Sequence, residues 1–70
     1  MVILMNSKNP PAAYRAMAAR LATMTIAQRA AELERAIAAV RAAEGMAPAT
    51  INKRYHAMFA CEDALRGTGV

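Results

Sequence analysis

The sequence has few of the residues that build disulfide scaffolds, zinc sites or aromatic cores. It contains one cysteine, one histidine and no tryptophan. A single cysteine excludes a disulfide framework, and one cysteine with one histidine cannot supply the four ligands of a structural zinc ion. The aromatic residues are Tyr14, Tyr55 and Phe59. So few large side chains argue against an enzyme with a buried, apolar cleft.

The hydrophobic content overstates the core that this chain can build. Of its 70 residues, 57% are hydrophobic, but nearly half of these are alanines, which add little buried area. A domain of this size buries roughly 60% of its unfolded surface, so its fold is marginal. We therefore expect a small, Ala-rich helical protein that needs a further surface to cover its apolar residues.

No group of residues has the spacing of a catalytic, cofactor or metal site. His56 and Cys61 are five positions apart, which places them on different faces of a helix. Glu32 and Glu34 diverge around a helix in the same way, and the chain has no Gly-rich phosphate loop. We expect a protein that is not an enzyme and needs no cofactor or metal, with Cys61 as a small core residue.

Local signals predict a short first helix and a break after it. Asn9 followed by Pro10 is typical of an N-cap and a first helical position, so a helix is expected from Pro10 to about Ala22. Thr25 and Gln28 have the spacing of a capping box, which predicts a new helix directly after Thr25. A single bent helix over residues 10–44 is the alternative.

The rest of the chain predicts an antiparallel helical hairpin of residues 26–44 and 48–66, and so an all-α fold. Gly45 is the expected left-handed residue after the first of these helices, and Pro48 suits the first turn of the second. A hairpin alone cannot bury its apolar stripes, which predicts a homodimeric helical bundle. The core or dimer candidates are Ile26, Leu33, Ile37, Val40, Ile51, Met58 and Leu65.

The charge of the chain is concentrated in its first half. The net charge is +4, and residues 1–31 carry four basic residues and no acidic one. We divide the chain into a basic arm with a short helix (1–24), a hairpin domain (25–67) and a tail (68–70). The basic arm predicts an acidic partner, the alternative being a solvated face. No apolar run approaches the ~20 residues of a membrane span, so a cytoplasmic protein is expected.

The second hairpin helix carries the candidates for binding a partner protein. They are Lys53, Arg54, Tyr55, His56 and Phe59. Aromatic side chains beside basic ones are typical of interface hot spots. The alternative is that Phe59 packs within the molecule or against a dimer mate.

A helix-turn-helix protein that binds DNA is the second hypothesis. Gly45 would lie in the turn, and the start of the next helix offers Thr50, Asn52, Lys53 and Arg54 to bases or phosphates. Two features argue against it. The preceding helix is long for such a unit, and Arg41 occupies a position where close helix packing favours a small side chain.

Three stretches carry a resemblance to a known group of proteins: TIAQRAAELERAI (25–37), RAAEG (41–45) and YHAM (55–58). Together with size and hairpin layout, they resemble small host-takeover proteins of Pseudomonas-type temperate phages, such as quorum-sensing anti-activators. The resemblance covers residues 23–67 and carries over no single functional residue. It implies a helical dimer that inhibits a host protein by binding it, such as a transcriptional activator or a pilus assembly ATPase.

Overall fold

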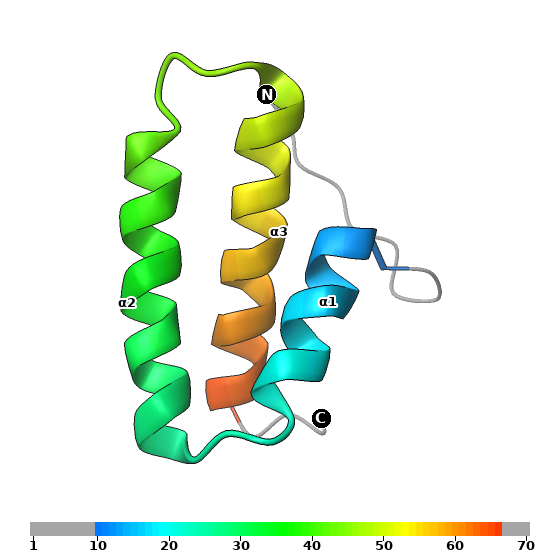
Figure 1. The fold of residues 1–70 in the computed structure, drawn as a ribbon, viewed down its shortest axis with the longest axis vertical. Helices are drawn as coiled ribbons and strands as arrows, with labels where there is room; N and C mark the ends of the chain where they lie inside the picture. Colours follow the sequence, from blue (N-terminus) through cyan, green and yellow to red (C-terminus); the bar gives the residue numbers. More distant parts are fainter. Residues whose placement is uncertain (1–9, 67–70) are drawn as a thin grey trace.

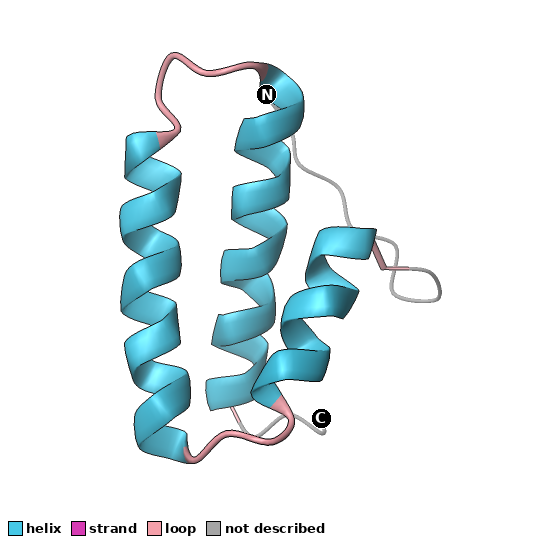
Figure 2. Cartoon of the chain, in the orientation of Figure 1, coloured by secondary structure: helices cyan, strands magenta, loops and turns pink. Residues whose placement is uncertain are grey.

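The computed structural model describes residues 10–66, and this part of the chain consists of three helices joined by loops, without a strand (Figure 2). The all-α prediction is confirmed. The helices are α1 (Ala12–Leu21), α2 (Ile26–Ala42) and α3 (Pro48–Leu65). The predicted cap at Asn9, the first nine residues of the basic arm and the tail at 68–70 lie outside the described residues.

Helix α1 begins two residues later than predicted, because two prolines follow one another. Pro11 is the N-cap and has an extended backbone (φ −56°, ψ 153°). A residue that precedes a proline is disfavoured in the helical region, so Pro10 cannot start the helix. The Pro11 carbonyl instead accepts the first helical hydrogen bond, from the Arg15 backbone N–H at 3.0 Å.

The break before α2 and the capping box are confirmed. The Gln28 backbone N–H donates to the Thr25 hydroxyl at 3.1 Å, and the Thr25 backbone N–H donates to the Gln28 side-chain oxygen at 2.9 Å. At the other end, Gly45 has a φ of +85°, as predicted, and this conformation costs a residue with a Cβ atom about 1 kcal/mol or more. Pro48 then opens α3 at its first position.

The three helices lie side by side, with α3 between α1 and α2 (Figure 1). Helices α2 and α3 run in opposite directions along their whole lengths, while α1 packs against the second half of α3. The buried apolar residues are small apart from one leucine: Leu21, Ala36, Ala43, Ala60 and Cys61. Cys61 is fully buried, as predicted for a small core residue.

The buried side of α2 is not its apolar stripe of Ile26, Ala30, Leu33, Ile37 and Val40, contrary to the sequence prediction. Ile26, at its first position, is 75% exposed and Ala30 is exposed. The positions that are buried on α2 are Glu32, Ala36 and Ala43. At ~100° per residue, this buried side lies about 100° around the helix from the stripe. Close packing of α2 on the small residues of α3 selects an alanine face and leaves the larger residues beside it.

The other core or dimer candidates lie at the margin of the core. Leu33 and Met58 are partly buried and pack against the core cluster. The remaining ones, Ile37, Val40, Ile51 and Leu65, are half-buried. Ile26 is therefore the one candidate that is wrong as a core residue, and its place in a dimer stays a prediction.

Candidate protein-interaction surface

The three ring-bearing candidates of α3 form one cluster outside the core. The Tyr55 and Phe59 ring centroids are 6.1 Å apart with their planes tilted by 45°. The His56 and Phe59 centroids are 6.4 Å apart, also tilted. All three side chains are half-buried. Tilted rings at these separations attract one another and hold the cluster together. We call Tyr55, His56 and Phe59 the aromatic patch.

The two basic candidates of α3 are not part of this patch. Arg54 turns toward α2, where its guanidinium donates to the Ala39 carbonyl at 2.9 Å. Lys53 is exposed, and on the helix it lies about 120° from Phe59 at ~100° per residue. The five predicted residues therefore divide into a cluster of rings, a helix-to-helix contact and a separate surface lysine.

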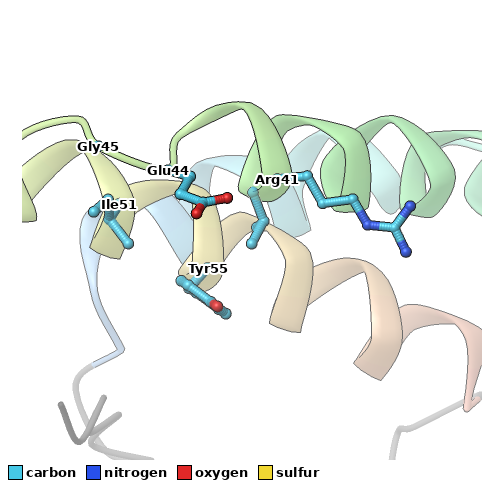
Figure 3. Close-up of a pocket in the computed structure, with 6 residues that line it drawn as sticks. Arg41, Glu44, Gly45, Ile51 and Tyr55 are labelled. Carbon is cyan, nitrogen blue, oxygen red and sulfur yellow. The ribbon is translucent and has the colours of Figure 1, made fainter.

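Beside the aromatic patch is an open hollow at the end of the hairpin (Figure 3). It has a volume of about 400 Å³ and is lined by Val40, Arg41, Glu44, Gly45, Ile51 and Tyr55. Ile51 and Tyr55 come from α3 and face residues of α2 across it. The Arg41 side chain extends along α2, away from the Glu44 carboxylate. The hollow thus offers an apolar base with charged groups at its edge.

A buried acidic group lies near the opposite end of α2. Glu32 is 8% exposed. Its carboxylate accepts from Arg35 at 2.5 Å and from Arg20 of α1 at 3.3 Å. The pair with Arg35 has the i,i+3 spacing of neighbours on a helix, but no local pattern indicates the contact with Arg20. Two guanidinium groups compensate for removing this charge from water.

Arg29 joins the ends of two helices to α2. Its guanidinium donates to the Leu21 carbonyl at 2.9 Å and to the Ala64 carbonyl at 3.3 Å. Both acceptors lie in the last turn of a helix, where carbonyl groups lack helical partners and a positive charge is favourable. Ala64 is 35 residues from Arg29 in the sequence, so no local pattern indicates this contact.

The pKa values of two titratable side chains of this region are raised. The Tyr14 hydroxyl of α1 donates to the Asp63 carboxylate of α3 at 2.5 Å, and this hydrogen bond, followed by burial, raises the pKa of Tyr14. Burial, and then the negative charge of Glu32, raise the pKa of the Cys61 thiol. A fully buried thiol with a raised pKa is a poor nucleophile. Cys61 is therefore a packing residue in this fold.

The residues of the DNA-binding hypothesis are also dispersed. Asn52 is half-buried, and its side-chain oxygen has no hydrogen-bond partner within the described residues. The same holds for the His56 Nε2 atom, one turn further along α3. Arg54 is engaged by α2, as described above. Of this set, Lys53 alone is exposed.

Comparison of the chain with models of protein families, with curated proteins and with solved structures finds no match. Within residues 10–66, no group of three or more His, Cys, Asp or Glu side chains is placed to hold a metal ion. No helix of the same part is long and apolar enough to cross a membrane.

Proposed function

We propose that this protein is a small, non-enzymatic binding module that inhibits a regulatory or motor protein by covering part of its surface. The observation that carries the proposal is the position of the aromatic patch. A chain with three aromatic side chains places two of them, with its one histidine, outside a core made mainly of alanines. Full burial of these rings would stabilise the monomer further, so their half-buried position outside the core favours a binding role.

The chemistry of the patch suits a protein partner. Aromatic rings contribute a large contact area at a low cost in side-chain entropy, and they are enriched among residues that dominate binding energy. The adjacent hollow, with its apolar base of Val40, Ile51 and Tyr55, can receive an apolar side chain of the partner. The net charge of +4 favours association with an acidic surface.

The resemblance to phage host-takeover proteins extends the proposal to the target. It points to a bacterial transcriptional activator or a pilus assembly ATPase, bound in the host cytoplasm. Occlusion needs no catalysis: the module has only to cover a surface that the target uses for DNA, nucleotide or subunit binding. A chain of 70 residues is large enough to cover an area of the size of a standard interface, about 800 Å² per partner.

A small DNA-binding protein is the second candidate, and the geometry supports it less. The two helices of a helix-turn-helix unit meet at roughly 90–120°, whereas α2 and α3 run side by side in opposite directions (Figure 1). Arg54 is held by the Ala39 carbonyl rather than being free for bases. Lys53 remains available for a phosphate contact.

The test is capture of a partner from nuclease-treated bacterial lysate with tagged protein, followed by reconstitution from purified components. We expect one stoichiometric protein, bound by the wild type and lost with Phe59→Ala. Met46→Ala is the matched control, because it removes an exposed apolar side chain (44% exposed) that is not part of the aromatic patch.

Two outcomes would contradict the proposal. One is capture that Phe59→Ala and Met46→Ala reduce equally. The other is recovery of nucleic acid alone, with binding that weakens steeply with salt, which would favour the DNA-binding alternative.

A further inference from the structure

The apolar stripe of α2 lies beside the side of the helix that packs on α3, and of its members Leu33 packs against the core cluster. We define the stripe as Ile26, Ala30, Leu33, Ile37 and Val40, whose spacing of 4, 3, 4 and 3 residues is that of a coiled-coil seam. The side of α2 that packs on α3 carries Ala36 and Ala43 instead. Along the stripe, exposure is 75% at Ile26, and Ile37 and Val40 are half-buried.

Two opposite charges flank this stripe. Glu34 directly follows Leu33, and Arg41 directly follows Val40, so both lie on the flank away from α3. Both are exposed, and none of the ion pairs found within residues 10–66 involves either of them. They are seven residues apart, which puts them on one side of the helix with about 10 Å between them along its axis.

We propose that the second half of the stripe, with Ile37 and Val40, is the interface with a second copy of this chain, which packs the second half of α2 against the same segment of its partner in antiparallel orientation. An antiparallel pair brings the same flank of both helices together, related by a two-fold axis. A two-fold axis beside Ile37 then places Glu34 of each copy against Arg41 of the other. This arrangement makes two identical ion pairs. The flank of one copy therefore matches the charges on the same flank of the other copy.

The same register brings apolar groups together. Ile37 of each copy packs against Val40 of the other, next to the hollow that Val40 lines. A register centred on Leu33 would place the two Glu34 carboxylates against one another, which is unfavourable. Phe59 belongs to α3 and not to the side of α2 that forms this interface, so the proposed dimer contact does not include it.

The test is the dimer dissociation constant, measured by sedimentation equilibrium at low salt for four variants. Glu34→Arg and Arg41→Glu each oppose like charges twice in the dimer, and each should raise the dissociation constant about tenfold or more. The double exchange Glu34→Arg/Arg41→Glu restores both pairs with reversed polarity, and should return the constant to near the wild-type value. Arg15→Glu, on the exposed surface of α1, is the control for a change in net charge.

The rescue by the double exchange is specific to this register, since a general loss of folding or a change in charge cannot produce it. Circular dichroism confirms that each variant is helical. A wild-type chain that is monomeric at every concentration would overturn the inference, as would single exchanges without effect or a double exchange as weak as the singles. The proposed binding through Phe59 is tested separately and survives any of these results.

Discussion

The two ends of the helical hairpin differ in how they are held. At the end where α1 packs, Leu21 and Cys61 are fully buried, Arg29 joins two helix ends, and Glu32 binds two arginines. At the end formed by the loop after α2, Ala43 is the one buried apolar residue, and a hollow of about 400 Å³ separates the helices. There Arg54 makes the interhelical hydrogen bond.

We infer that the α1 end of the hairpin mainly stabilises the fold, whereas the loop end provides the binding surface. The α1 end contains the largest buried side chain and most of the polar contacts between helices, so we expect it to contribute most of the stability. The loop end leaves Ile51 and Tyr55 open around the hollow, next to Phe59. Substitutions at the two ends should therefore have unequal effects on the free energy of unfolding.

The largest difference is expected between two apolar truncations. Leu21→Ala removes a side chain that is 1% exposed, and should lower the free energy of unfolding by about 2–5 kcal/mol. Ile51→Ala, at the edge of the hollow, should lower it by less than half as much. Urea denaturation followed by circular dichroism measures both values. Equal losses of unfolding free energy in the two variants would contradict the inference that the α1 end contributes more to stability than the loop end.

A smaller difference in unfolding free energy is expected between variants at two arginines, Arg29 and Arg54. Arg29→Met removes two hydrogen bonds to helix-end carbonyls and should cost about 2 kcal/mol, whereas Arg54→Met removes one and should cost about 1 kcal/mol. Methionine keeps much of the apolar stem in both cases. Urea denaturation measures both losses. A larger loss of unfolding free energy for Arg54→Met than for Arg29→Met would show that the loop end is the more stable one.

The smallest effect concerns the hydrogen bond between α1 and α3. Tyr14→Phe should cost about 1 kcal/mol at neutral pH, because it leaves the Asp63 carboxylate without its phenol donor. The pKa of Tyr14 is raised above its ordinary value of 10.0 in the folded state, so the unfolded chain releases this proton first. Stability should therefore fall as the pH rises above about 10.

The control for this pH effect is the Tyr14→Phe variant itself. Its free energy of unfolding should decline less steeply than that of the wild type over the same alkaline range, while Cys61, whose pKa is raised above 9.0, contributes in both proteins. Thermal unfolding at a series of pH values measures the two slopes. Parallel slopes would show that the hydrogen bond does not contribute to the pH dependence.

The break before α2 and the start of α3 were predictable from the sequence because their signals are local. The Thr25–Gln28 capping box, the positive φ of Gly45 and the position of Pro48 all agree with the prediction. The buried side of α2 was not predictable from its apolar residues. It depends on which side of the helix meets the alanines of α3 and the Leu21 side chain of α1, and residue periodicity does not contain that information.

The candidate site was predictable in part for the same reason. Tyr55, His56 and Phe59 are neighbours on one helix, so their clustering follows from spacing alone. The separation of Arg54 from them depends on the Ala39 carbonyl of another helix. The contacts of Arg29 and Arg20 also join residues far apart in sequence, and no motif indicates such contacts.

The central claim is that the aromatic patch serves binding rather than folding. The most direct test is the dissociation constant for the reconstituted partner, measured by titration calorimetry with the wild type and with Phe59→Ala. A hot-spot residue predicts an increase of roughly 30-fold or more, with a smaller loss of unfolding free energy than for Leu21→Ala. An unchanged dissociation constant, together with a loss of stability equal to that of Leu21→Ala, would contradict the account.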